Sequence, residues 1–474
     1  MNNDANSFVA YPLEEPCSFI ELHRHNPKRY PFLLESTAKA ATVNEAIASE
    51  HARYSVLFAF PQDSITLFGS GEIKSERYKI IKNDFLDTFS SAWQAEASQN
   101  NITSQDANTS FLGWFVFAAY ELVQFIEPTL KLELDSSAVI ARATRIPFAI
   151  VCDMDANTNT IVCENVFTEK ISKVLDDISM VAKHNRAKQN LTNELKTEHF
   201  RVNLNEEDES EFLDGVHKIK RYIYDGDIFQ VNYSRQWQGT LKDGASAVDL
   251  YTSLKNHNPA PFSALVHYDE FDIICSSPER LVKTHNKNIE TRPIAGTRPR
   301  VSNDVDMLNE LLSHPKERAE HIMLIDLERN DLGRVCKPGS VEVTELMSLE
   351  SFAHVHHIVS NIAGKLNKTV LPGDIIRAVF PGGTITGCPK VRCMEIISEL
   401  EKTPRGAYTG SLGYIGHNGN MDLNILIRTL VKQGKHISLR AGAGIVADSN
   451  AELELEETRA KAKGILLSLV DIHD

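Results

Sequence analysis

The stretch TRIPFAIVCDMDANTNTIVCENV, residues 144–166, indicates most clearly how this chain folds. Two apolar arms rich in β-branched residues flank the polar segment Asp155-Ala156-Asn157-Thr158-Asn159, a pattern that predicts a β-hairpin. Two more short apolar runs, residues 53–60 and 64–70, are separated by Pro61 and end at Gly71. Because strands follow one another in hairpin-like runs instead of a strict βαβ rhythm, the sequence predicts an α+β fold.

The chain changes character near residue 190. Residues 168–196 are helical in pattern but polar, and residues 206–211 are a run of acids. After them, Phe212, Val216, Ile219 and Ile223 form one apolar helical stripe, which a strand-like alternation follows. We therefore predict an N-terminal domain over residues 1–190, a linker over 191–210 and a catalytic domain over 211–474.

Composition excludes several classes of protein. The 474 residues carry a net charge of −14, and 42% are hydrophobic, which is typical of a globular protein. No basic excess is available to neutralise phosphates, so we expect no nucleic-acid partner. An anionic small molecule would need a locally positive pocket or a metal ion.

The seven cysteines are scattered, with no C-x-x-C pair and no zinc-ligand spacing. The first residues contain acids and no apolar segment typical of a signal peptide. The most apolar stretch, residues 111–120, is too short to span a bilayer. We therefore expect reduced thiols, a cytoplasmic location and no membrane association.

Two pairs of acids stand at helical i, i+3 spacing. Glu317 and Glu320 belong to a helix predicted over residues 314–334, and Glu454 and Glu457 to one predicted over 448–469. Ser449 with Glu452 reads as a capping box for the second helix. Each pair alone is typical of a solvated helix face. If the helices meet, the four carboxylates need a hard cation such as Mg²⁺.

Three further segments are rich in glycine or contain isolated charges. Gly442, Gly444 and Ala447 match G-x-G-x-x-A, but no second strand follows, so we interpret them as a tight turn whose N–H groups bind a carboxylate. GGTITGCPK (382–390) lacks the P-loop spacing and leaves Lys390 as an anion contact. Glu279 precedes the PIAGT loop (293–297).

Taken in chain order, these segments resemble the chorismate-utilising enzymes, a family that includes anthranilate, aminodeoxychorismate, isochorismate and salicylate synthases. The resemblance rests on GDIFQVN, SPER, PIAGT, ERAEHIMLIDLERND, HHIVS, GGTITGCPK, GNMD, IRT, GAGIVADS and EET, all between residues 226 and 458. PFLLES (31–36) and ARYS (52–55) resemble the N-terminal domain of the ammonia-using branches. The resemblance implies a two-sheet sandwich with helices on the outer faces, an α/β/β/α arrangement.

The resemblance also implies roles for single residues. Glu320 and Glu457 match the Mg²⁺ ligands, and Glu317 and Glu454 match acids that hold the metal's water molecules. Glu279 matches the general acid that protonates the departing hydroxyl group. The matching substrate pocket comprises Gly296, Thr297, His357, Thr384, Lys390, Tyr408, Arg428, Gly442, Ala443 and Gly444.

Gln230 indicates whether water or ammonia is the nucleophile of the reaction. The water-using branches have a lysine base at this position, and a glutamine side chain does not deprotonate water. Ammonia needs no such activation, so Gln230 favours amination. The sequence contains no glutaminase nucleophile motif, and we expect a glutamine amidotransferase partner to supply the ammonia.

The sequence contains features of both ammonia-using branches, the aminodeoxychorismate branch and the anthranilate branch. NPAPFSA (258–264), VHHIVS (355–360) and the double glycine of FPGG resemble aminodeoxychorismate synthase component I, which serves 4-aminobenzoate and folate synthesis. Ala295 matches the anthranilate branch, which has alanine at this position, whereas aminodeoxychorismate synthases have a lysine there. We predict an aminodeoxychorismate synthase, with anthranilate synthase component I as the alternative and an inactive scaffold homologue as the remote one.

The same resemblance predicts a tryptophan pocket between the N-terminal strands and the main domain. Ser36, at the end of PFLLES, would contact tryptophan together with Pro261, Phe262 and Ser263. An ordinary strand and turn is the alternative interpretation.

Overall fold

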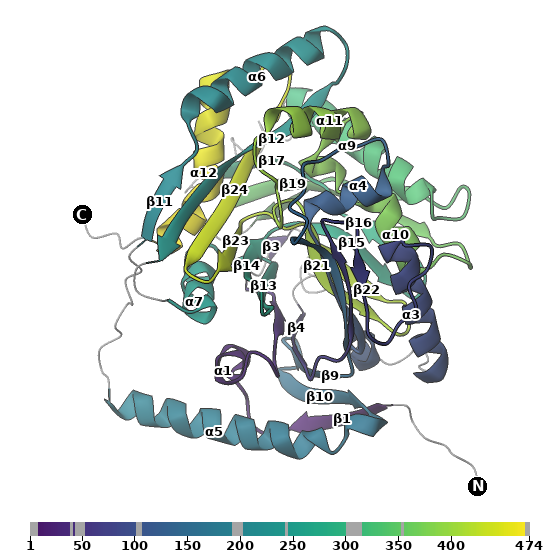
Figure 1. Cartoon of the computed structure of the whole chain (residues 1–474), viewed down its shortest axis with the longest axis vertical. Helices are drawn as coiled ribbons and strands as arrows, with labels where there is room; N and C mark the ends of the chain where they lie inside the picture. Colours follow the sequence, from purple (N-terminus) through teal and green to yellow (C-terminus); the bar gives the residue numbers. More distant parts are fainter. Residues whose placement is uncertain are drawn as a thin grey trace.

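The computed structural model describes residues 8–37, 41–42, 53–100, 107–191, 202–241, 245–299, 315–351 and 355–469. Its strands form two twelve-stranded sheets in which all pairings are antiparallel, and helices surround both (Figure 1). The predicted α+β class is therefore confirmed.

The first sheet contains the hairpin predicted at residues 144–166. Its arms are β9 (Phe148–Asp153) and β10 (Thr158–Glu164), joined through the polar turn. The strand order is β1 (Phe8–Leu13), β10, β9, β4 (Tyr54–Ala59), β2 (Phe32–Glu35), β13 (Phe262–His267), β14 (Asp272–Ser277), β23 (Thr429–Gln433), β24 (His436–Ile445), β12 (Gln230–Leu241) and β11 (Val202–Glu206), with β20 (Gly387–Cys388) beside β12.

The second sheet is built mainly from the C-terminal half and closed by strands of the N-terminal part. Its order is β3 (Ala41–Thr42), β18 (Glu342–Ser351), β19 (Val355–Lys365), β16 (Asn288–Thr291), β15 (Arg280–His285), β22 (Met421–Asn424), β21 (Ser411–Gly416), β7 (Gly113–Ala118), β8 (Val139–Ile146), β5 (Ser64–Phe68) and β6 (Ile73–Lys74), with β17 (Ile294–Pro299) beside β19.

Apolar side chains from both sheets meet in a central core. Phe32 of β2 stacks on Phe115 of β7 with ring centroids 4.1 Å apart, and the aromatic residues around them exclude water from the interface. Alternation along each strand points one face inward, as the period of two requires. This core holds the two sheets face to face.

Helices cover the outer faces, as the predicted α/β/β/α layering requires. The first sheet packs against α1 (Phe19–His25), α5 (Lys170–Leu191), α7 (Ala247–His257) and α12 (Ala451–Leu469). The second sheet packs against α3 (Phe85–Asn100), α9 (Pro315–Gly333) and α10 (Pro372–Val379). A smaller cluster joins α6 (Glu209–Tyr224) and α11 (Lys390–Leu400) to β12 and β24.

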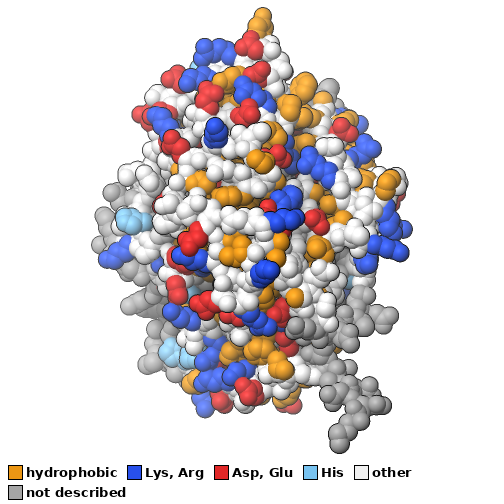
Figure 2. All heavy atoms as spheres, turned by 45° about the vertical axis from the view of Figure 1, so that its right-hand side comes forward, with side chains coloured by type: hydrophobic (Ala, Val, Ile, Leu, Met, Phe, Trp, Pro, Cys, Tyr) orange, Lys and Arg blue, Asp and Glu red, His pale blue; other side chains and the backbone are white. Residues whose placement is uncertain are grey.

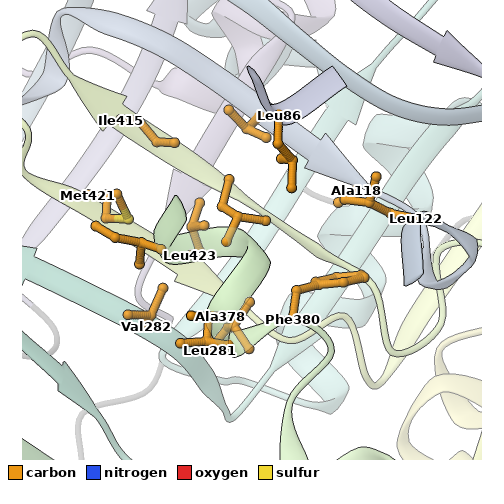
Figure 3. Packing of buried hydrophobic residues seen from close by; sticks show 14 of the residues in the cluster. Leu86, Ala118, Leu122, Leu281, Val282, Ala378, Phe380, Ile415, Met421 and Leu423 are labelled. Atoms are coloured by element: carbon orange, nitrogen blue, oxygen red, sulfur yellow. The ribbon is translucent and has the colours of Figure 1, made fainter. Parts of the chain in front are cut away.

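The core beneath the second sheet positions one edge of the functional site. Leu281 and Val282 of β15 contact a cluster that also contains Leu423, Ala378 and Phe380 (Figure 3). Leu281 is fully enclosed, at 2% exposure, and it lies two residues after Glu279. The hydrophobic packing of β15 therefore fixes the backbone that presents Glu279.

Both sheets cross the predicted domain boundary. β2 pairs with β13, and β7 pairs with β21, so strands from residues before 190 and after 211 share hydrogen bonds. The division at 191–210 stays a prediction. Within that linker, Val202–Glu206 form β11, and Asp208 caps α6 by accepting a hydrogen bond from the Ser210 backbone N–H.

Acidic and basic side chains alternate over the face shown in Figure 2, without an extended basic area there. Among the helices of the described ranges, none has the length and apolar composition needed to cross a bilayer. All seven cysteines are free thiols, which agrees with their scattered spacing.

Candidate active site

Glu279 lies in the connection between β14 and β15. Its backbone C=O accepts a hydrogen bond from Ile425 N–H (3.0 Å), and its own N–H donates to Ser277 Oγ (3.2 Å). The next residue, Arg280, is buried and donates Nε to the Asp422 carboxylate at 2.8 Å. The SPER and GNMD segments of the sequence are thus joined by an ion pair that orients Glu279.

The carboxyl group of Glu279 is buried, with 5% of the residue exposed. Thr384 Oγ1 donates a hydrogen bond to Glu279 Oε1 at 2.7 Å. Burial raises the pKa of Glu279 to about 7; the Thr384 hydrogen bond lowers it and the charge of Glu328 raises it. A carboxyl group with this pKa holds its proton near neutral pH, as a general acid must.

Arg428 and His357 lie in the electrostatic neighbourhood of Glu279. Arg428 occupies the left-handed region (φ 51°) immediately before β23, and burial lowers its pKa while the charge of Glu279 raises it. The ring of His357, on β19, is hydrogen-bonded to the backbone of Gly296; burial and the Arg428 charge lower its pKa to about 3. His357 is therefore neutral, and Arg428 is a cation whose charge acts on Glu279.

Gly296 lies in an irregularity of β17, where the register against β19 shifts between Ala295 and Thr297. Its φ of 67° is in the left-handed region that favours glycine. Thr297 is the Cα partner of His357, so the PIAGT segment forms a strand beside the histidine. The side chains of Ala295 and Thr297 lie outside the described part of the chain.

Gln230 begins β12 and faces α9. Its Nε2 donates to Glu320 Oε1 at 2.7 Å, and its buried Oε1 has no hydrogen-bond partner among the described residues. A Cβ on Gly444 would lie 2.6 Å from Gln230 Nε2 and 3.7 Å from Glu320 Oε1. Gly444 is therefore needed for the close approach of these two side chains.

Residues 442–444 form part of β24, so the tight turn predicted there is wrong. Gly442, Ala443 and Gly444 all pair with β12. The two glycines lack a side chain because a Cβ at either position would collide with neighbouring atoms. At Gly442 that Cβ would lie 2.8 Å from Tyr408 Oη. β23 pairs with β24 only as far as Leu439, so within the described residues the other edge of the 442–444 segment has no strand partner.

Helix α12 places a second carboxylate beside this edge. Lys461 Nζ donates to the Gly442 C=O at 3.0 Å and pairs with Glu457 at 2.7 Å. The helix begins one residue after Asn450, whose Oδ1 accepts from Leu453 N–H at 2.9 Å. Asn450 is thus the N-cap, and the capping box predicted at Ser449 is wrong because the Ser449 hydroxyl accepts from Val446 N–H instead.

The predicted Mg²⁺ ligands come from two helices, and each is linked to the 442–444 segment of β24. Glu320 of α9 lies near Gly444, and Glu457 of α12 is linked through Lys461 to Gly442. Within the described residues, no three His, Cys, Asp or Glu side chains form a complete metal site. Mg²⁺ keeps several waters and binds through one or two carboxylates plus substrate oxygens, so Glu320 and Glu457 are of the right ligand type, and their binding of Mg²⁺ stays a prediction.

The other two predicted acids are less defined. The backbone of Glu317 lies in α9, but its side chain is outside the described part of the chain. Glu454 lies in the first turn of α12, half-buried, one turn before Glu457. Both roles stay predictions.

Lys390 begins α11 and is engaged within the protein. Its ammonium group pairs with Asp331 of α9 at 2.5 Å and donates to the Pro381 C=O at 3.0 Å. Asp331 is almost fully buried, and burial raises its pKa while Lys390 lowers it. In this conformation Lys390 links α9 to α11, and an anion contact would require it to leave Asp331.

The predicted tryptophan-pocket residues lie together. Ser263 of β13 is the Cα partner of Glu35 of β2, so Ser36 follows directly beside the segment 261–263. Thr37, which sequence analysis missed, bonds the Ser263 hydroxyl at 2.9 Å and the Ala260 C=O at 3.0 Å. Tryptophan binding here stays a prediction.

The structure also shows buried charges that sequence analysis missed. Glu401 contacts Arg405 and Arg440, and Glu328 is buried in α9 near Glu279. Away from the site, an open pocket of about 750 Å³ lies between residues 131–135 and 397–405; none of the predicted site residues lines it.

Residues 39–467 match the family model of the chorismate binding enzymes, and the chain belongs to that family. Anthranilate synthase component 1 of Synechocystis is 35% identical over 92% of this chain and 90% of the relative. The crystal structure of anthranilate synthase component I from Streptococcus pneumoniae is similar with a TM-score of 0.74 and 29% identity, covering 87% of this chain and 92% of that one.

A higher identity is found over a shorter span. Aminodeoxychorismate synthase component 1 of Bacillus subtilis is 51% identical over 54% of this chain and 54% of its own length. The chain thus matches about half the length of that relative. Aminodeoxychorismate synthases and anthranilate synthases are thus both among the relatives that are similar to this chain.

Proposed function

We propose that this chain catalyses the amination of chorismate to 4-amino-4-deoxychorismate, with ammonia delivered by a glutamine amidotransferase. The observation that carries the proposal is the buried Glu279 carboxyl group, held by Thr384 and protonated near neutral pH. A protonated carboxyl in a site that also contains Arg428 suits a substrate that is both an anion and a source of a leaving hydroxyl.

In the proposed reaction, Glu279 donates its proton to the departing ring hydroxyl, which leaves as water, and Glu279 becomes a carboxylate. Ammonia supplies the electron pair for the new C–N bond and loses a proton afterwards. Arg428 and Tyr408 bind the enolpyruvyl carboxylate, together with backbone N–H groups at the open edge of residues 442–444.

Gln230 supports ammonia as the nucleophile. Its amide is fixed by the hydrogen bond to Glu320 and has no basic atom that would take a proton from water. Glu320 and Glu457 would hold Mg²⁺, which neutralises the ring carboxylate of the substrate. Gln230 then orients Glu320 toward that site.

The 51% identity to an aminodeoxychorismate synthase supports the 4-amino product. Anthranilate synthase is the second candidate, and Ala295 favours it, because alanine has no amine to attack the ring. Without that lysine, ammonia itself must attack the ring, so we expect slow turnover and some 2-amino by-product.

Product identity tests the proposal. The purified chain is incubated with chorismate, Mg²⁺ and an ammonium salt at alkaline pH, and the products are identified by mass spectrometry and fluorescence, with and without a lyase that converts 4-amino-4-deoxychorismate to 4-aminobenzoate. Dominant anthranilate would assign the second candidate. Unchanged chorismate under all conditions would indicate the inactive scaffold.

The partner is tested separately. Glutamine alone should give no product, glutamine plus an amidotransferase subunit should give it, and ammonia should replace both. Consumption of glutamine by the single chain would contradict the division of labour.

A further inference from the structure

A second buried acid lies close to Glu279. Glu328 belongs to α9, two turns after Glu320, and only 4% of it is exposed. Its Oε1 accepts a hydrogen bond from the Gly383 backbone N–H at 3.2 Å, and its Oε2 lies 3.1 Å from Thr291 Oγ1. No cation contacts this carboxyl group directly within the described residues.

The turn after α10 connects the two acids. Gly383 contacts Glu328 through its N–H, and the next residue, Thr384, donates its hydroxyl to Glu279. A Cβ on Gly383 would lie 2.5 Å from the Leu327 side chain, so only glycine lets the turn approach α9 this closely. The short helix Gly383–Ile385 therefore holds one carboxyl group on each side.

The hydrogen bonds of Thr291 show which form of Glu328 the site accommodates. Thr291 Oγ1 lies within hydrogen-bond distance of both the Leu281 C=O (3.0 Å) and Glu328 Oε2. A hydroxyl group has one proton to donate. An ionised Glu328 would have to share the single Thr291 proton with Leu281, whereas a protonated Glu328 donates to Thr291 and leaves Thr291 free to donate fully to Leu281.

We propose, resting on the chorismate amination above, that Glu328 is a positioning residue for Glu279. Glu328 anchors the turn whose residue Thr384 donates a hydrogen bond to the Glu279 carboxyl group. Its negative charge, when present, also disfavours ionisation of Glu279 in the same buried space, so that Glu279 keeps its proton. Two carboxyl groups buried close together do not both ionise readily, because the charge of one raises the pKa of the other.

The charges around the pair are consistent with this role. The pKa of Glu328 is raised to about 7: burial and the charge of Asp331 on its own helix raise it, and Lys390 of α11 lowers it. Around Glu279, Arg428 before β23 and Lys461 of α12 favour the ionised form, and Tyr408 also faces it. Glu328 is thus the group that opposes these two cations.

Two variants separate anchoring from charge. Glu328→Gln keeps the shape and both hydrogen bonds but removes the ionisable group, so Arg428 and Lys461 should favour ionised Glu279 at lower pH. We expect its rate relative to wild type to be near one at about pH 6 and to fall about threefold to tenfold by about pH 8. Glu328→Asp keeps the charge but has a shorter reach to Gly383, so its relative rate should be reduced equally at every pH.

Initial rates are measured as variant-to-wild-type ratios at each pH, which cancels the ionisation of ammonia. Asp326→Asn is the matched control, because Asp326 is on the same helix with a side chain 79% exposed. A flat ratio for Glu328→Gln overturns the proposal, as does a pH-dependent ratio for Asp326→Asn.

A readout without substrate keeps this test independent of the proposed function. Infrared difference spectra record protonated carboxyl groups as pH rises, and Glu279→Gln identifies the Glu279 contribution. In Glu328→Gln that contribution should disappear at a lower pH than in wild type. An unshifted disappearance overturns the proposal even if the enzyme uses a different substrate.

Discussion

Two groups of buried carboxyl groups in this protein differ in their hydrogen-bond partners: one group is paired with arginines, and the other is not. Glu401, with its side chain 2% exposed, accepts hydrogen bonds from Arg405, from Arg440 and from Ser234. Burial alone would raise the pKa of Glu401, but the two arginines outweigh it and hold the pKa below its ordinary value. Glu279 and Glu328 have hydroxyl and backbone partners instead, and their pKa values rise to about 7.

The comparison shows that burial does not decide what an acid does; its partners do. A carboxylate matched to two arginines stays ionised and links β12, β24 and the segment after α11. A carboxyl without a direct cation keeps a proton that it can transfer. Glu401 is thus distinguished from Glu279 and Glu328 by the groups that donate hydrogen bonds to it.

The largest effect on stability is expected when the Glu401 charge is removed. Glu401→Gln leaves Arg405 and Arg440 buried without a counter-charge, which costs about 3–5 kcal/mol of unfolding free energy. Denaturant unfolding measures this loss. Glu399→Gln is the control, because Glu399 is an exposed acid two residues earlier that accepts a hydrogen bond from Tyr222; this variant should change stability by less than about 0.5 kcal/mol.

Removing the reactive acid should affect the rate instead. Glu279→Gln keeps a group that accepts the Thr384 hydrogen bond but has no transferable proton, so turnover should fall about 10²–10⁴-fold while the protein stays folded. Rates with saturating chorismate and circular dichroism check this. Wild-type rates in this variant would contradict the general-acid role.

The same variant should change how stability depends on pH. In the folded protein the pKa of Glu279 is raised from 4.5 to about 7, so its contribution is fully present below the unfolded pKa and is lost as pH rises through about 7. Wild type should therefore lose about 1–3 kcal/mol relative to Glu279→Gln between about pH 5 and pH 8. Urea unfolding at a series of pH values measures this difference, and parallel profiles would contradict it.

The smallest effect on stability is expected at an exposed acid. Glu457 pairs with Lys461 while nearly half of each side chain is exposed, so Glu457→Gln should change unfolding free energy by less than about 0.5 kcal/mol. The variant should nevertheless lose its activity, because the substitution removes a proposed Mg²⁺ ligand, and Glu320→Gln should have the same effect. Wild-type rates in the presence of EDTA would contradict the metal requirement.

Local patterns predicted the elements that carry these acids. The helix predicted over residues 314–334 matches α9 to within a residue at each end, and the hairpin at 144–166 was predicted from its two apolar arms and the polar segment between them. Such features depend on spacing within one segment, which a sequence displays directly.

Features set by distant neighbours were not predictable in the same way. Gly442 and Gly444 looked like turn residues, and only the positions of Tyr408 and Gln230 explain why a strand contains them. Glu328 looked like one more acid on a polar helix, because burial against Thr291 and Gly383 depends on segments far along the chain. The one available signal was its spacing, because Glu328 follows Leu324 and Ile325 by four and three residues and so shares a helix face with them.

The pairing of β7 with β21 and of β2 with β13 has a consequence for synthesis of the chain. The ribosome releases β7 long before β21 is synthesised. The edge of β7 that pairs with β21 therefore stays unpaired until nearly all of the polypeptide has emerged. Such late closure makes folding slow and exposes strand edges to other nascent chains. Production of this protein should therefore gain from low temperature and chaperone supply, and a fragment ending before residue 411 should aggregate.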